Sequence, residues 1–276
     1  EGHFAKLYAK RLASFAMNEF EVAGILEKMA RLTGNQSDVE HWKNLIRSDP
    51  VHIRRMFDQR WEANGVSGYF AAPKNGMIMT SGFWAMRSPY FPNEYARAMV
   101  DAWALDREKG FYGAFFPLAM SRQSMKIFNT DVDHSFGYTP DTAYFTLDGM
   151  FCQGLLEKAA ELTLNHIENY NYHAQWQIPV APEAYKRDLT LFGDQFSNFN
   201  AGKILLYLEG LGGLRYSIPD KKLTINPALP EAWEWMEIRF PIAGQWTRIR
   251  YSHDGVKVSG CPLAVSTGSR QSKARP

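Results

Sequence analysis

The feature that most constrains the fold is a change in the spacing of apolar residues near Arg215. Before this point, apolar side chains recur every three or four residues, which is the period of a helix with one buried face. After it, they alternate with polar residues, as in a strand with one buried face. The sequence therefore predicts a mainly α chain, with a helical part over residues 1–215 and a small antiparallel β-sandwich-like module over residues 216–261.

The helical part divides into paired helices and long irregular segments. A first helix is expected to end at Gly34, and a second to run from Ser37 or Asp38 to about Phe57, so that the two form an αα-hairpin. Further helices are expected over about 92–106, 141–169 and 198–213. The irregular segments between them, 58–92, 110–140 and 170–197, are long for connections, and long loops are commonly functional.

The β module is predicted from strict alternation. Its alternating apolar residues are Leu223, Ile225, Met236, Ile238 and Phe240. The segment RIRYSHDGVKV reads as a hairpin with Asp254 and Gly255 in its turn. Residues 262–276 are rich in Ser, Arg and Lys and are expected to be a disordered tail.

Composition excludes several classes of function. The 276 residues are 45% hydrophobic, which is enough to bury a sizeable core, and 31 basic against 29 acidic residues give a net charge of +2. Neither a nucleic-acid nor a membrane-surface partner is expected from that balance, and no apolar run reaches the ~20 residues of a membrane span. Cys152 and Cys261 lie in different modules, so a disulfide is not expected, and the cellular compartment stays open.

Motifs for other chemistries are incomplete. Asp131 and Asp133 suggest a calcium loop, but His134 stands where that loop needs glycine. His166 and His173 lack metal-ligand spacing, and the GLGGL segment ends a helix instead of following a strand, so it predicts a helix cap and close packing. No metal and no cofactor are therefore expected.

Several motifs carry a resemblance to a known family. Gly110-Phe111 through Pro117-Leu118, with Ser121-Arg122, is similar to a GF-x-x-x-x-P loop. Pro182-Glu183-Ala184-Tyr185 with Gln195 to Asn200 is similar to an acidic loop before the last helical hairpin. Asn226-Pro227-x-Leu229-Pro230-x-x-Trp233 is similar to the P-x-LP-x-x-W that opens a terminal β-sandwich. The chain thus resembles the C-terminal half of the six-hairpin glycoside hydrolases, of the trehalase, mannosyl-oligosaccharide glucosidase or rhamnosidase-like kind.

The resemblance implies an (α/α)6-toroid segment that hydrolyses an α-linked glycoside with inversion, using two carboxyl groups. The predicted helices are too few to close such a ring. We therefore expect that earlier hairpins, which would also carry the general acid, or an oligomeric partner complete the ring. Apolar residues around Leu12, Phe15 and Ile25 of the first hairpin are then expected to be exposed.

The resemblance also assigns the catalytic base to Glu183. Pro182 and Tyr185 restrict the backbone around it, and Trp176 and Phe196 are candidates to desolvate it and tune its pKa. Asp194 is the alternative base, although it is also a candidate to cap the helix expected near Asn198.

Six residues are predicted to bind the carbohydrate substrate, because they are aromatic rings or arginines in the long loops: Trp84, Arg87, Phe116, Arg122, Tyr138 and Trp176. For Trp84 and Arg87, a loop-anchoring tryptophan and a solvated arginine are equally consistent with the sequence. Three alternatives to hydrolysis stay open. A phosphorylase or a polysaccharide lyase would use the same fold, and a carbohydrate-binding scaffold would lack a catalytic carboxylate.

Overall fold

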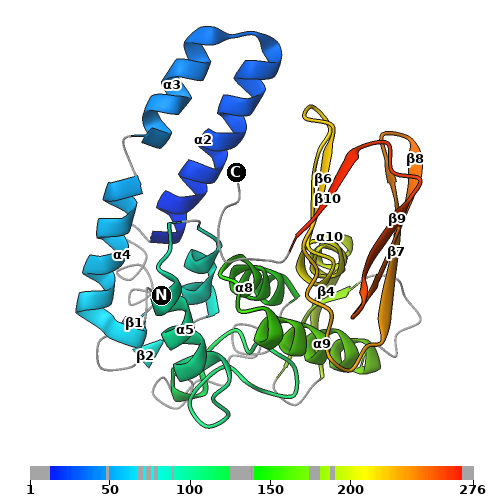
Figure 1. Cartoon of the computed structure of the whole chain (residues 1–276). Coiled ribbons are helices and arrows are strands. Elements are labelled where there is room, and N and C mark those ends of the chain that lie inside the picture. Colours follow the sequence, from blue (N-terminus) through cyan, green and yellow to red (C-terminus); the bar gives the residue numbers. More distant parts are fainter. Residues whose placement is uncertain are drawn as a thin grey trace.

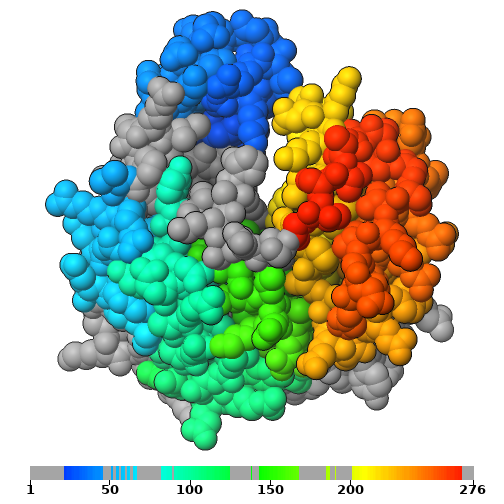
Figure 2. All heavy atoms as spheres, in the orientation of Figure 1, coloured from blue at the N-terminus to red at the C-terminus, as the bar shows by residue number. Residues whose placement is uncertain are grey.

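The computed structural model describes residues 13–47, 50–67, 71–72, 76–77, 80–88, 90–124, 138, 140–173, 181–186 and 190–268. Helices dominate the first part of the chain and strands dominate from Leu214 onward, as the change of period predicts. Figure 1 shows the helices and the β module side by side, and in Figure 2 the β module forms a lobe of its own beside the helical body.

The helical part contains α-helices, short 3₁₀ and π segments and two small hairpins. In chain order its elements are α2 (Ala13–Thr33), α3 (Gln36–Arg47), α4 (Pro50–Asn64), η1 (Gly65–Ser67), β1 (Ala71–Ala72), β2 (Gly76–Met77), η2 (Thr80–Arg87), α5 (Asn93–Met99), η3 (Val100–Ala104), α8 (Pro140–Cys152), α9 (Leu156–His173), β3 (Ala181–Tyr185), β4 (Leu191–Phe196), α10 (Ser197–Leu205) and η4 (Leu206–Leu211).

The predicted first hairpin is present as α2 and α3, which project from the body in Figure 1. Gly34 ends α2 with a φ of 74°, a conformation that favours glycine. Ile25 is exposed as expected, and it lies in a stripe of exposed apolar residues at helical spacing along α2, with Val22 before it and Met29 and Leu32 after it. Leu12 and the side chain of Phe15 lie outside the described residues. The partner that would cover this stripe stays a prediction.

Three predicted helix boundaries are wrong. The single helix expected from Ser37 or Asp38 to about Phe57 is two helices, α3 and α4, of which α4 begins at Pro50, a residue favoured in the first turn of a helix. The expected irregular segment from residue 58 is helical up to Asn64, because Trp61 stacks on Tyr95 with ring centroids 4.1 Å apart and so extends the packed face of α4. The single helix expected over 141–169 is two helices, α8 and α9. Gly154, with a φ of 70°, ends α8, and the N–H of Leu155 returns to the carbonyl of Met150 at 3.0 Å.

The core joins the helices to the β module. It gathers side chains from η2, α5, η3, α8 and α9, among them Phe83, Met99, Leu147 and Leu162. Leu223 and Ile249 of the β module belong to the same buried cluster, so the two parts share one core. Burying this much apolar surface is the main force that holds the two parts together.

The β module is a pair of three-stranded sheets. Its strands are β5 (Leu214–Ser217), β6 (Lys222–Ile225), β7 (Trp235–Ile242), β8 (Gln245–Ser252), β9 (Gly255–Ser259) and β10 (Ala264–Thr267), in the orders β10–β6–β5 and β7–β8–β9. The expected inward residues are buried: Leu223, Ile225, Met236 and Ile238 are all under a tenth exposed, and Phe240 is partly buried. The β8–β9 turn is formed by His253 and Asp254, and Gly255 opens β9.

Two expectations about the β module differ from the structure. The module is not purely antiparallel, because β10 pairs with β6 in parallel. Residues 264–267, expected in a disordered tail, form this strand, because Ala264–Thr267 completes the backbone hydrogen bonding of the β6 edge. The boundary between helical and β domains at residue 215 stays a prediction.

Candidate functional site

The segment that carries Glu183 and Asp194 is a β-hairpin, where the sequence suggested a loop. Strands β3 and β4 pair antiparallel, with Pro182 opposite Gln195 and Ala184 opposite Phe192. Between these pairs the register shifts by one residue, so Glu183 faces Gly193 and Asp194 together in a β-bulge. The backbone therefore places the two predicted catalytic residues opposite each other in one hairpin, and bulges are common next to active sites.

The structure also corrects one role that the sequence left open for Asp194, the capping of the following helix. This residue lies inside β4, and α10 begins three residues later, at Ser197. The residue that caps a helix stands immediately before its first turn. Asp194 therefore does not occupy the N-cap of α10.

The hairpin is attached to the loop of residues 110–122 through Tyr138. The N–H of Tyr138 donates to the carbonyl of Tyr185 at 2.9 Å, and the N–H of Tyr185 donates back to Tyr138 at 3.0 Å. Tyr138 also bridges to Leu118 on its other side. Glu183, two residues before Tyr185, is thus held beside the loop that contains Phe116 and Arg122, two of the residues predicted to bind the substrate.

Tyr138 is buried and spans this junction with its side chain as well. The N–H of Ala114 donates to the Tyr138 hydroxyl at 2.9 Å, and the ring of Phe115 meets Tyr138 edge-on at 5.1 Å. Phe115 also contacts Tyr185 at 5.5 Å, and burial raises the pKa of Tyr185 to about 12. Tyr185 is therefore a neutral anchor at ordinary pH.

Phe116 and Arg122, both predicted to contact substrate, organise the same loop. The ring of Phe116 is fully buried, and the N–H of Arg122 donates to the carbonyl of Gly110 at 3.0 Å, which closes the base of the loop. The Arg122 Nε donates to the carbonyl of Tyr112 at 3.3 Å. Their roles toward substrate stay predictions, as does that of Trp176, which lies outside the described residues.

The sequence suggested only a metal-ligand role for His166. In the structure, its side chain forms a hydrogen bond to the backbone of the 110–122 loop. Its Nδ1 lies 2.8 Å from the carbonyl of Phe116, and because a carbonyl only accepts, Nδ1 carries the hydrogen and donates. Burial, with a smaller effect from the positive charge of Lys203, lowers the pKa of His166 to about 4. A neutral imidazole therefore fixes the backbone between Phe116 and Pro117.

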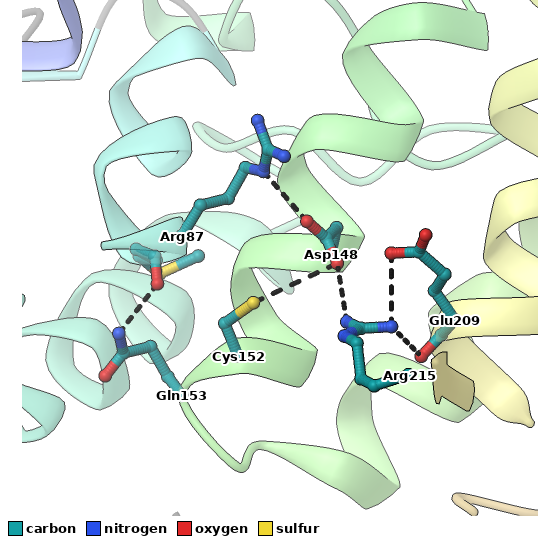
Figure 3. A network of polar contacts seen from close by, with 7 residues as sticks. Arg87, Asp148, Cys152, Gln153, Glu209 and Arg215 are labelled. Atoms are coloured by element: carbon teal, nitrogen blue, oxygen red, sulfur yellow. Dashed lines mark hydrogen bonds and ion pairs between the residues drawn. The ribbon is translucent and has the colours of Figure 1, made fainter. Parts of the chain in front are cut away.

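Trp84 and Arg87 lie on η2, next to α8. The ring of Trp84 packs at 4.9 Å from Phe145, and the guanidinium of Arg87 lies 5.1 Å from the centroid of the same ring. Arg87 Nε donates to Asp148 Oδ2 at 2.8 Å, as Figure 3 shows. Arg87 is thus held in place by an ion pair, unlike the solvated arginine that the sequence left open.

Asp148 is the centre of this network of charges. Its side chain is 1% exposed, and its Oδ1 lies 3.6 Å from Nη2 of Arg215, whose Nη1 is 3.1 Å from Glu209. The Cys152 thiol lies 3.9 Å from Asp148 Oδ1. Positive and negative groups alternate from Arg87 to Glu209 (Figure 3), and these opposite charges compensate the buried carboxylate. In the sequence, Arg215 is distinguished by its position at the point where the spacing of apolar residues changes.

The part of the chain that the structure describes holds no group of three or more His, Cys, Asp or Glu side chains that could bind a metal ion. Cys152 and Cys261 are not joined in a disulfide. Among the described helices, none is long and apolar enough to cross a membrane.

Comparison with known proteins gives one family for the β module. Residues 216–265 match the model described as "Glycosyl hydrolase family 65, C-terminal domain". The match confirms the resemblance to the C-terminal part of the six-hairpin glycoside hydrolases, and it ends at residue 265, inside β10. No curated protein matches the chain.

Proposed function

We propose that this protein hydrolyses an α-linked glycoside with inversion, and that Glu183 is the general base. The observation that carries the proposal is the β-bulge that brings Glu183 and Asp194 to one position, next to the loop of residues 110–122. The match of residues 216–265 to a glycosyl hydrolase domain supports a glycoside as the substrate. The helices are proposed to belong to an (α/α)6 toroid, the fold that the resemblance implies.

Inverting hydrolysis needs a carboxylate that activates water on one face of the sugar and a carboxylic acid that protonates the leaving oxygen on the other. A base must be held at a fixed distance from the anomeric carbon, because a small displacement costs much of the rate. The Tyr138–Tyr185 backbone bonds hold β3 in that way. Asp194, at the same bulge, is the alternative base.

Arg87 and Trp84, which are also predicted to bind the substrate, suit a neutral sugar. Arg87 presents a guanidinium whose Nε is already fixed by Asp148, which lowers the entropy lost when the remaining N–H groups bind hydroxyls. Trp84 offers an aromatic face beside it. No cofactor is required by this chemistry.

The experiment is an assay of the protein on α-glucosides, α-mannosides and α-rhamnosides, with the products followed by proton NMR. The expected result is release of the free sugar as the β anomer first, at a rate that does not depend on inorganic phosphate. A phosphate requirement and a sugar phosphate product would identify a phosphorylase. An unsaturated product would identify a lyase, and binding without turnover would identify a scaffold.

A further inference from the structure

The outer face of the sheet β7–β8–β9 has an unusual composition. Alternate residues of these strands point away from the core, and Figure 1 shows the strands at the margin of the molecule, farther from α2–α5 than β6 and β10. The residues of this face are Trp235, Glu237, Arg239, Pro241, Trp246, Arg248, Arg250, Ser252, Gly255, Lys257 and Ser259. We call it the outer sheet face.

Cations on this face stand opposite one another. Arg239 pairs with Arg248 across β7–β8. Arg250 pairs with Lys257 across β8–β9, and the residue opposite Arg250 on β7 is Glu237. Like charges directly opposite each other on neighbouring strands destabilise the strand pairing. Two such pairs on one face are therefore not explained by the stability of the fold alone.

A single carboxylate balances part of this charge. Glu237 accepts from Arg239 and from Arg248, each at 2.7 Å, and these two hydrogen-bonding partners lower its pKa, Arg248 more than Arg239. Within the described part of the chain, no carboxylate lies within ion-pair distance of Arg250 or Lys257, and the Arg250 guanidinium rests on the Trp235 ring at 4.7 Å. The outer sheet face therefore carries excess positive charge.

Exposed tryptophans stand at both ends of the same face. Trp246 is 72% exposed and Trp235 is 51% exposed, whereas tryptophan is usually buried for most of its area. Trp246 lies opposite Pro241, six residues along β7 from Trp235, which puts the two rings roughly 20 Å apart along the strands. The arginines lie between them.

We propose that the outer sheet face is a binding site for an acidic polysaccharide, with uronate carboxylates on the arginines and sugar rings on Trp235 and Trp246. The negative face of an indole attracts the C–H groups of a pyranose, and a guanidinium matches a carboxylate with two parallel hydrogen bonds. A repeating anion would also neutralise the opposed cations along the strands. The site is separate from Glu183 and does not depend on the activity proposed for it.

The test measures binding of the whole chain to oligogalacturonate by calorimetry, with fully methyl-esterified oligogalacturonate as the uncharged match. Binding is expected for the acid form, weakening steeply from 50 mM to 500 mM salt, and not for the ester. Trp246→Ala is expected to lower the affinity about tenfold. Arg250→Gln is expected to lower it roughly fivefold with little change in melting temperature, because Lys257 repels Arg250 whereas Glu237 and the Trp235 ring attract it.

Matched controls come from the other sheet of the module. Tyr216→Ala removes a 59% exposed ring on β5, and Lys222→Gln removes an exposed cation on β6, and neither is expected to alter the affinity. Equal binding of acid and ester, equal binding of single-stranded DNA, no binding of the acid, or the same affinity in Trp246→Ala would each overturn the proposal.

Discussion

Arg215 in β5 places its Nη2 atom 3.6 Å from Oδ1 of Asp148 in α8. The other carboxylate oxygen accepts from Arg87 on η2, so one buried group joins an element of the β module to an element of the proposed substrate site. The β module therefore supports the helical part through charge as well as through the shared apolar core.

Asp148→Asn is expected to destabilise the protein by about 3 kcal/mol, because it leaves two arginines facing a neutral group in a buried site. The free energy of unfolding is measured by urea denaturation at pH 7. Asp220→Asn is the control, since Asp220 is exposed and accepts only from Ser217 among the described residues. A change in Asp148→Asn no larger than that of the control would remove the network from the account of stability.

The buried His166 is expected to make the folded protein less stable in acid. Its pKa is about 4 in the folded protein and 6.5 in the unfolded chain. Between these values the unfolded chain binds more protons, so stability rises with pH. The contribution, on the order of 3 kcal/mol, is fully present above pH 6.5 and is lost as the pH falls from about 6.5 to about 4.

His166→Asn tests this linkage, because the Asn side chain amide keeps a donor for the Phe116 carbonyl but does not titrate in this range. Urea denaturation from pH 4 to pH 7.5 should show a shallower pH dependence in the variant than in the wild type. Parallel curves for the two proteins would assign the acid sensitivity to other groups.

Gly213 marks the place where the helical part meets the β module. Its φ is 60°, and a Cβ there would lie 1.7 Å from the carbonyl oxygen of Asn226. Gly213→Ala is therefore expected to cost about 3 kcal/mol or more. Gly244→Ala separates strain from collision, because its φ is 80° but nothing lies within 4 Å of the added Cβ, and about 1 kcal/mol is expected. Similar losses in the two variants would show that backbone strain alone is responsible.

Much of the fold could be predicted because apolar periodicity reports which face of an element is buried. Leu223 and Ile249 are fully buried where the period of two places them, and the GLGGL segment provides the cap and close packing expected of it. The β3–β4 hairpin could not be predicted, because Pro182 and Gly193 are turn residues by propensity. The pairing of β3 with Tyr138, which helps to stabilise the strand, is a long-range contact. The parallel β10 depends on a long-range contact that leaves no local signal.

The candidate site was predictable where its chemistry is local. Glu183 and Asp194 lie in one segment of the sequence, so both could be predicted as candidate carboxylates. The register shift that places them opposite each other depends on how the two strands pair, which the sequence does not indicate. Asp148, His166 and Arg215 act through partners far away in the sequence, so residue type alone did not reveal those contacts.

The catalytic proposal is tested by a pair of variants. Glu183→Gln keeps the size and hydrogen-bonding capacity of the side chain but cannot take a proton, so kcat is expected to fall on the order of 10²–10⁴-fold with little change in KM. Asp194→Asn is expected to cost much less if Glu183 is the base, because both residues lie at one bulge and only the base contacts the attacking water. Azide offers a further check in Glu183→Ala, because the shortened side chain leaves room for this anion to attack the anomeric carbon in place of water. Azide should restore turnover in Glu183→Ala and leave Asp194→Asn unchanged. An active wild type whose Glu183→Gln variant keeps most of its kcat would move the assignment of the base to Asp194.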